Sequence, residues 1–341
     1  MNEVVVITGA GAGVGRATVR AFAKAGYDVG LIGRDAERLE AAAAEVRAAG
    51  RRACVTPADV ADVADVADVA DVADAHAVDA AANKIEQELG PITVWVNNAM
   101  ATVFAPVSDT TPEEVKRGTE VTYLGTVHGT IAALRHMRPR KHGAIINVGS
   151  ALAYRSVPLQ AVYCGAKSAI RGFTDSLRSE LIHDKAGIHL TMVHLPAVNT
   201  PQFDWALNKM RRKAMPVPPV YQPEVPAGAI VFAAQHRRRE MWVGLPTVVA
   251  IMANRIAPGF ADRYLARTGY SGQLTDIPEP ANAPANLFHT VPGDQAAHGR
   301  FDKVARRGSL ELFISERRVG VAAFVVVGLI GLHLLAKRLD I

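Results

Sequence analysis

Short runs of apolar, often β-branched residues alternate with amphipathic helical stretches over much of this chain, and the alternation limits the possible folds. The spacing predicts helices at 16–25 and 35–50 and further helical stretches between the later strands. Strands that alternate with helices form one parallel sheet through right-handed crossovers. We therefore expect an α/β fold with a doubly wound parallel sheet. Its predicted strands are 4–7, 27–33, 51–59, 91–99, 143–150 and 188–195.

A glycine-rich string, TGAGAGVG at 8–15, lies between the first predicted strand and the first predicted helix. Glycines at such a junction let the backbone turn tightly and approach a pyrophosphate, which the N–H groups of the helix N-terminus then bind. A tight structural turn is the alternative interpretation. The position at the start of a doubly wound pattern favours a nucleotide-binding loop. Its predicted contacts are Thr8, Gly9, Gly13, Val14 and Gly15.

Tyr163 and Lys167 lie four residues apart in a predicted helix, and Ser150 precedes the tyrosine by thirteen residues. Residues four apart share one face of a helix, so the ammonium group is expected beside the phenol. A nearby cation favours the phenolate, which otherwise forms only near the ordinary tyrosine pKa of about 10. The alternative is an unremarkable pair on an amphipathic helix. The upstream glycine loop favours a proton-transfer site.

Three motifs together resemble one known family. They are the string TGxxxGxG at 8–15, the triplet Asn97-Asn98-Ala99, and YxxxK at 163–167 with Ser150 before it. In this order and spacing they resemble the short-chain dehydrogenase/reductase family over about residues 1–250. The resemblance implies a Rossmann-type catalytic domain that transfers a hydride between a nicotinamide dinucleotide and a carbonyl or alcohol substrate. It also leaves a homo-oligomer open, since dimers and tetramers are common in the family.

The resemblance implies a catalytic role for each residue of the motif. Tyr163 would be the general acid in carbonyl reduction and the base in alcohol oxidation. Lys167 would favour the phenolate and bond the nicotinamide ribose, and Ser150 would hold and polarise the substrate oxygen. Thr122 takes the place of an asparagine that holds a relay water in the family. A hydroxyl has one donor where the amide has two, which puts this relay in doubt.

The resemblance also implies cofactor contacts outside the glycine loop. Asp59 would bond the adenine amino group, unless it is only a helix N-cap. Asn97 would support the fourth strand and line the adenosine side of the site. Val198 and Thr200 occupy the positions that contact the nicotinamide carboxamide in the family.

The end of the second predicted strand bears on the choice of cofactor. NAD-dependent enzymes place a carboxylate there to bind the ribose 2′-hydroxyl, but this chain has Gly33 followed by Arg34. A guanidinium suits a 2′-phosphate because its planar fork matches the phosphate oxygens. We therefore expect NADP(H) rather than NAD(H). A solvated charge at a helix start is the alternative for Arg34.

Further departures from the family pattern keep a second function open. Met100 replaces a glycine after Asn97-Asn98-Ala99, and Leu195-Pro196 replaces the usual Pro-Gly pair. Together with Thr122 they are compatible with a nucleotide-binding scaffold or redox sensor that has lost turnover. A scaffold has no need for the complete Ser-Tyr-Lys set, so an active oxidoreductase is the preferred interpretation.

Residues 58–74 repeat the triplet Ala-Asp-Val, directly after the third predicted strand. A three-residue period drifts around a helix and cannot hold one apolar stripe against a sheet. We expect a repeat expansion inserted in a loop or at a helix N-terminus, with a spacer or interaction arm as the alternative.

The C-terminal part differs in character from the first 250 residues. Residues 251–318 form an extension, whose stretch 278–299 is rich in Pro, Ala and Asn and is expected to be irregular. The following run, 319–336, has no charged residue and would span about 27 Å as a helix, near the thickness of a bilayer core. It predicts a transmembrane anchor, with an interfacial or oligomer-packing helix as the alternative. More basic residues precede than follow it, which places the catalytic domain in the cytoplasm.

Composition excludes some partners, and one stretch suggests the substrate. With 38 basic and 33 acidic residues and no basic stripe, nothing indicates nucleic-acid binding. The two cysteines lack metal-ligand spacing, so no metal site is expected. Apolar residues after Thr200 are expected either to cap an apolar substrate cleft or to form the core of a lid helix. They are Phe203, Trp205, Leu207 and Met210. A membrane anchor would make a lipophilic small-molecule substrate the natural choice.

Overall fold

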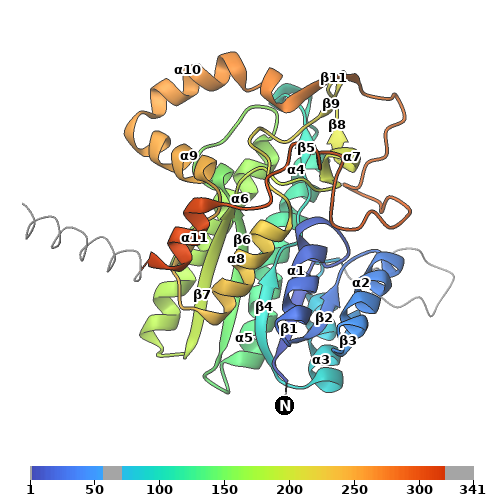
Figure 1. Ribbon diagram of the computed structural model, residues 1–341, viewed down its shortest axis with the longest axis vertical. Helices are drawn as coiled ribbons and strands as arrows, with labels where there is room; N and C mark the ends of the chain where they lie inside the picture. The colour runs from blue at the N-terminus through green and yellow to red at the C-terminus, as the bar shows by residue number, and fades with distance from the viewer. Residues whose placement is uncertain (1, 57–70, 319–341) are drawn as a thin grey trace, which may run out of the picture.

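The computed structural model describes residues 2–56 and 71–318, and its centre is a seven-stranded parallel sheet (Figure 1). The strand order is β10-β7-β6-β4-β1-β2-β3, as expected for a doubly wound fold. The strands are β1 (Val4–Thr8), β2 (Asp28–Ile32), β3 (Ala53–Thr56), β4 (Ile92–Asn97), β6 (Gly143–Ser150), β7 (Ile188–Leu195) and β10 (Glu240–Trp242). All six predicted strands are confirmed. The sequence reading missed β10, which is only three residues long.

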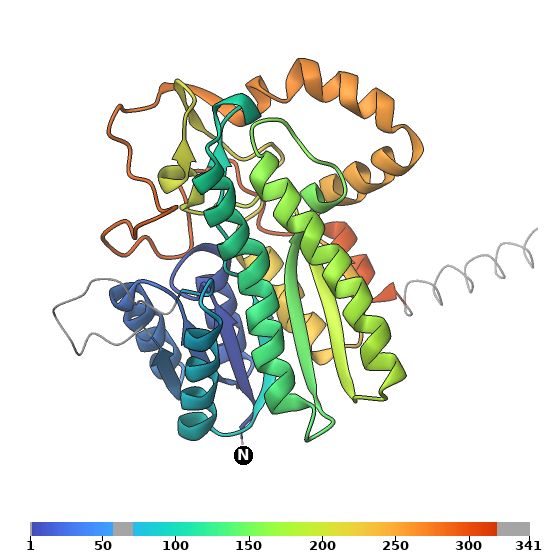
Figure 2. The same ribbon diagram turned by 180° about the vertical axis from the view of Figure 1, so that it is seen from behind.

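Helices cover both faces of the sheet (Figures 1 and 2). The helices on the face seen in Figure 1 are α1 (Gly13–Lys24), α2 (Ala36–Ala48) and α8 (Glu224–Gln235). Those on the face seen in Figure 2 are α3 (Ala75–Leu89), α4 (Pro112–Thr119), α5 (Gly125–Met137) and α6 (Ala161–His183). A π-helical turn, Glu120–Leu124, joins α4 to α5. The helices predicted at 16–25 and 35–50 correspond to α1 and α2.

Side chains of the buried strands contribute to two separate hydrophobic cores, one on each face of the sheet. Successive side chains of a strand point to opposite faces, so Val5 and Ile7 of β1 join one core while Val4 and Val6 join the other. The first core includes Phe22 of α1, and the second includes Ile85 of α3 with Leu177 and Leu181 of α6. Because both faces are covered, the strands are apolar throughout rather than alternating.

Shorter elements gather beyond the carboxyl ends of the strands. Two small sheets lie there, β5 (Val103–Phe104) with β8 (Leu207–Asn208) and β9 (Arg212–Ala214) with β11 (Leu274–Pro278). The helices at this end are α7 (Gln202–Trp205), α9 (Leu245–Ile256) and α10 (Pro258–Thr268). Short 3₁₀ turns occur at Val107–Asp109, Ala151–Ala153 and Ser271–Gln273. Together these elements cover the edge of the sheet where the predicted site lies.

The C-terminal extension packs back onto the catalytic domain. Its strand β11 pairs with β9, and Arg306 bridges to Tyr221. Residues 279–309, all of them described, contain no helix or strand, and α11 (Leu310–Glu316) follows. The extension is therefore part of the same folded unit.

Several predictions fall on residues outside the described ranges. Asp59 and most of the repeat 58–74 lie within 57–70, and the uncharged run 319–336 lies wholly beyond Arg318. Among the described residues, no helix is both long and apolar enough to cross a bilayer. The anchor at 319–336 and the role of Asp59 remain predictions.

Candidate active site

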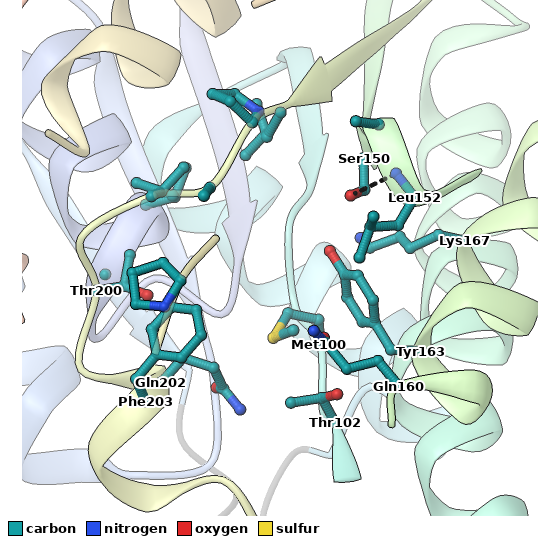
Figure 3. Close-up of a pocket in the computed structure, with 18 of the residues that line it drawn as sticks. Met100, Thr102, Ser150, Leu152, Gln160, Tyr163, Lys167, Thr200, Gln202 and Phe203 are labelled. Carbon is teal, nitrogen blue, oxygen red and sulfur yellow. Dashed lines mark hydrogen bonds between the residues drawn. The ribbon is translucent and has the colours of Figure 1, made fainter. Parts of the chain in front are cut away.

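The fold brings the three predicted catalytic residues together (Figure 3). Ser150 is the last residue of β6, and Tyr163 and Lys167 lie one turn apart in α6. The Lys167 Nζ atom lies 5.6 Å from the centroid of the Tyr163 ring and donates a hydrogen bond to the Val148 carbonyl at 2.6 Å. The Ser150 Oγ atom accepts the Leu152 N–H at 3.1 Å, so its own proton is still available for donation. In Figure 3 the Tyr163 hydroxyl points towards Ser150.

Burial dominates the electrostatics of these residues. Burial raises the pKa of Tyr163 to about 12, and the neighbouring Ser150 hydroxyl lowers it only in part. Burial also lowers the pKa of Lys167 to about 7, since a desolvated ammonium is disfavoured. Tyr163 in this environment therefore holds its proton at neutral pH. Formation of the phenolate requires a further positive charge beside it.

The glycine loop sits against the same site. Gly9 has a φ of +65°, which L side chains rarely adopt, and a Cβ on Gly15 would lie 2.0 Å from the Gly9 carbonyl oxygen. Asn98 holds the loop, because its Nδ2 donates to the carbonyls of Thr8 and Gly9. The Thr8 hydroxyl accepts the N–H groups of Asn98 and Ala99. Thr8 thus links the glycine loop to the backbone after β4 and does not line the cavity.

One cavity of about 460 Å³ runs from the glycine loop past the catalytic residues. Gly9, Gly13, Val14 and Gly15 line one end of it, and Val198 and Thr200 line its wall. Met100, which replaces the family's glycine, also lines it. The far end is mostly apolar and includes Phe104, Leu152, Phe203, Trp205, Met215, Val217, Ala250 and Leu265. Figure 3 shows Phe203 and Thr200 facing Tyr163 across the cavity.

Comparison with known proteins places this geometry in a family. The family described as short chain dehydrogenase matches residues 3–71 and 66–211. The oxidoreductase YxnA of Bacillus subtilis is 31% identical over 335 residues, which cover 96% of this chain and 89% of YxnA. The chain belongs to the short-chain dehydrogenase family. It is an oxidoreductase of the dehydrogenase/reductase type, and its Rossmann-type fold is the one the family resemblance implied.

Two further relatives of this short-chain dehydrogenase are informative. A fatty acyl-CoA reductase of Acinetobacter baylyi is 27% identical over 252 residues, which cover 73% of this chain and 79% of that enzyme. A metagenomic short-chain oxidoreductase solved in complex with NADP is 25% identical with a TM-score of 0.57. That match covers 71% of this chain and 96% of the other. The dehydrogenase is therefore similar to a named reductase and to an oxidoreductase that binds NADP.

Besides Thr8, three predicted site residues do not line the cavity of this dehydrogenase: Arg34, Asn97 and Thr122. Asn97 is buried on the opposite face of β4, where its Oδ1 accepts the Trp95 indole N–H and its Nδ2 donates to Asn147 and Thr130. It supports the strand, as expected, but it does not line the adenosine side. Strand alternation is the reason, since the next residue, Asn98, takes the cavity side.

Thr122 is also fully buried and lies in the π-helical turn. Its hydroxyl accepts the Ala101 N–H at 3.0 Å and donates to the Ala101 carbonyl at 3.1 Å. The single hydroxyl proton is thus committed to the backbone beyond β4. Thr122 positions the chain that carries Met100, and its side chain has no proton left to donate to a relay water.

Arg34 lies in a cluster of three guanidinium groups, of which the sequence reading named only one. The others are Arg38, one turn along in α2, and Arg117 of α4. The Arg34 Nη2 atom donates to the Asn286 carbonyl at 2.6 Å, and its buried Nη1 has no hydrogen-bond partner among the described residues. Burial lowers the pKa of Arg34, the Asp71 carboxylate paired with Arg117 opposes this effect, and the two neighbouring arginines add to it. The proximity of Arg38 was readable from its spacing, whereas that of Arg117 was not.

A segment of the extension lies across this arginine cluster, and we call residues 286–296 the strap. Its backbone carbonyls accept hydrogen bonds from Arg38, through Val291 and Gly293, and from Arg117, through Leu287. The strap also reaches the glycine loop, where the Gly13 N–H donates to the Ala296 carbonyl at 3.0 Å. The sequence reading expected only an irregular segment here.

A buried polar network behind Ser150 was also missed. The His194 Nδ1 atom lies 3.1 Å from the Ser150 carbonyl oxygen, and its Nε2 lies 3.6 Å from a Glu240 carboxylate oxygen. The same carboxylate accepts the Tyr154 hydroxyl at 2.7 Å and the Trp242 indole N–H at 3.0 Å. Burial lowers the pKa of His194 to about 4, against the opposing effect of Glu240. The available signal was the presence of two histidines, His189 and His194, inside the apolar run 188–195.

Proposed function

We propose that this dehydrogenase transfers a hydride between NADP(H) and a lipophilic carbonyl or alcohol, with Tyr163 as the general acid or base. The observation that carries the proposal is the convergence of Ser150, Tyr163 and Lys167 on a cavity that runs to the glycine loop. The proton donor Tyr163 and the neutral hydroxyl of Ser150 lie where one substrate oxygen can meet both, and the Lys167 ammonium lies beside the Tyr163 ring. This complete arrangement favours turnover over the alternative of an inactive scaffold or redox sensor.

The catalytic residues have separate tasks in the proposed reaction. The nicotinamide dinucleotide, when bound, supplies or accepts the hydride. Ser150 donates a hydrogen bond to the substrate oxygen, and Tyr163 gives that oxygen a proton during reduction or removes one during oxidation. The raised pKa of Tyr163 keeps the proton in place for the acid role. For the base role, the positive charges of an oxidised nicotinamide ring and of Lys167 would stabilise the phenolate.

The residues at the adenosine side fit a phosphorylated dinucleotide. The glycine loop has no room for a Cβ at Gly15, and Arg34 has a buried Nη1 with no described partner. The carboxylate of Asp35 is directed at α2, because its Oδ1 accepts the Arg38 N–H at 3.0 Å and its Oδ2 lies 3.4 Å from the Arg38 Nε. Arg34, with Arg38 and Arg117 beside it, would therefore bind a 2′-phosphate through its guanidinium.

The substrate end of the cavity supports a lipophilic substrate. Phe203, Met215, Val217 and Leu265 form an apolar wall opposite the catalytic residues. The relative from Acinetobacter baylyi is named for a fatty acyl substrate. We further propose that residues 319–336 anchor the protein in a membrane with the catalytic domain on the cytoplasmic side, as the flanking charges indicate.

A cofactor titration tests this proposal. Cofactor fluorescence is followed while purified protein is titrated with NADPH and, separately, with NADH, for the wild type and for Arg34→Ala. We expect NADPH to bind more tightly and the substitution to weaken NADPH about tenfold or more while leaving NADH nearly unchanged. Equal binding of both cofactors would overturn the NADP(H) preference. Binding without turnover of any lipophilic ketone or alcohol would favour the scaffold.

A further inference from the structure

Helix α9 carries an apolar stripe on its outer side. Leu245, Val249, Met252 and Ile256 follow the spacing i, i+4, i+7, i+11, which keeps them within an arc of about 60°. Their exposed fractions lie between 40% and 76%. Such a run is too long and too regular to be the scattered apolar surface that every soluble protein has.

The inner side of the same helix closes the substrate cavity. Pro246, Thr247 and Ala250 line the cavity from α9, Leu265 lines it from α10, and Ile251 is fully buried. A single layer of helix therefore separates the apolar end of the cavity from the outer stripe. Any molecule that approaches the stripe is next to the wall of the substrate site.

Helix α10 extends the outer surface. Phe260 and Tyr264 are 70% and 56% exposed, and their rings stack with centroids 6.4 Å apart. Arg263 and Arg267 alternate with them on the exposed side of the helix. The one acidic residue of α10, Asp262, is paired with Arg155 at 2.6 Å. We call the six exposed apolar residues of α9 and α10 the lid face.

Helix α11 lies beside the start of α9 on the same flank of the molecule (Figures 1 and 2). The two are joined by a hydrogen bond from the Gly244 N–H to the Glu311 carboxylate. Leu310, Phe313 and Ile314 of α11 are also exposed. The chain continues from this flank through Arg317 and Arg318 into the uncharged sequence 319–336.

We propose that the lid face rests on the surface of a lipid bilayer with anionic headgroups, so that lipophilic molecules pass from the lipid into the cavity beside α9 and α10. Aromatic and aliphatic side chains with arginines between them are typical of helices that lie in the membrane interface. A second copy of the chain is the less favourable occupant. A twofold contact would set the arginines of one lid face against those of its partner.

A lipid-quenching experiment on the full chain tests the docking without needing turnover. Cys54 and Cys164 are buried, so an environment-sensitive fluorophore can be attached selectively to an introduced cysteine. Ile256→Cys places the probe on the lid face. Ala44→Cys places the control probe on an exposed position of α2, on the opposite side of the molecule (Figure 1). Each protein is mixed with vesicles of phosphatidylcholine and phosphatidylglycerol, with or without brominated lipid.

We expect the probe at 256 to brighten with vesicles and to be quenched by brominated lipid, while the probe at 44 responds to neither. Because both proteins contain the same sequence 319–341, a tethering anchor alone cannot produce this difference. Quenching of both probes or of neither would overturn the proposal. So would brightening of the 256 probe without lipid as the protein concentration rises, which would indicate a second copy on the lid face.

A second experiment, which rests on the proposed function, measures whether the lid face affects the use of a substrate that is dissolved in lipid. The double variant Val249→Asp, Ile256→Asp places charge on the lid face, and neither residue lines the cavity. We expect its KM for a long-chain alcohol dissolved in vesicles to rise about tenfold, with kcat/KM for a short water-soluble homologue unchanged. Ala44→Asp is the matched control. An equal rise for both substrates would point to misfolding and, together with an unquenched probe at 256, would overturn the docking.

Discussion

The floor and the cap of the cavity differ in how far apart in the chain their contacting residues lie. The floor consists of the glycine loop, the end of β6 and the start of α6. The Lys167 hydrogen bond that joins α6 to β6 spans 19 residues, and the Asn98 hydrogen bonds that hold the glycine loop span 89 and 90. The cap consists of α7, α9, α10 and the strap. Three strap hydrogen bonds join residues 170 to 255 positions apart. The floor is thus built mainly from short motifs, and the cap from distant parts of the chain.

The difference has a chemical counterpart. The floor holds its polar groups in place with backbone carbonyls and strand ends, which suits proton transfer at one fixed position. The cap presents apolar side chains to the substrate end and backbone carbonyls to the arginine cluster. We infer that the floor determines the reaction and that the cap determines which molecules reach it. Four substitutions can break or sharpen this comparison.

The largest effect is expected in the floor. Tyr163→Phe removes the hydroxyl that is proposed to exchange the proton with the substrate and should lower kcat about a thousandfold, with the affinity for NADPH little changed. Steady-state kinetics and the cofactor titration measure the two quantities. A variant that turns over at nearly the wild-type rate would show that Tyr163 is not the acid or base.

The next effect tests whether the strap is part of the main folded unit. Leu287 is fully buried in the core on the α3 and α6 side, so Leu287→Ala should lower the free energy of unfolding by about 2–4 kcal/mol. Chemical denaturation measures the change. Its matched control is Phe288→Ala, because Phe288 is the next residue and is half-exposed. Equal, small effects of both would mean that the strap unfolds separately from the core.

His194, which lies behind Ser150, should make the stability of the protein decrease at acidic pH. Burial lowers the pKa of His194 to about 4 in the folded state, so the unfolded chain binds more protons between about pH 6.5 and pH 4. The free energy of unfolding should therefore fall as the pH falls through this window, by on the order of 2 kcal/mol. His194→Asn, which keeps a donor for the Ser150 carbonyl, should remove that dependence. Denaturation at stepped pH checks it, and an unchanged slope in the variant would contradict it.

A histidine next to the strap should act in the opposite direction and more weakly. Burial alone would lower the pKa of His298, but its contacts with Glu224 at 2.7 Å and Asp302 at 2.8 Å raise it. The stabilisation is therefore complete below about pH 6.5 and is lost as the pH rises through the raised value. Since His298 is 38% exposed, it should amount to about 0.5 kcal/mol or less.

Hydrogen exchange of the strap amides measures this smaller effect, with His298→Gln as the comparison. We expect exchange of the wild-type strap to quicken above neutral pH, beyond the intrinsic rate, and the variant to show no such step. A wild-type strap that is equally protected at both ends of the range would mean that His298 does not hold it.

Much of the fold was predictable because it is encoded in local patterns. Six strands of the sheet followed from apolar runs, and the glycine string at 8–15 indicated the nucleotide end of the site. The site was predictable where a motif and a helix face coincide, as for Tyr163 and Lys167. The prediction that Asn97 lines the adenosine side was wrong. Of the adjacent residues Asn97 and Asn98, the one that faces the cavity depends on which face of β4 each occupies, and the sequence does not show that.

The sequence by itself determined the sheet, the glycine loop and the Ser-Tyr-Lys set, because strand alternation, helix periodicity and a turn that needs glycine act over a few residues. Only the tertiary structure decided that Arg38 and Arg117 join Arg34, that the strap covers them, and that His194 lies behind Ser150. These contacts form between segments that carry no common pattern. They exist because burying apolar residues such as Leu287 brings distant backbone groups within hydrogen-bonding distance.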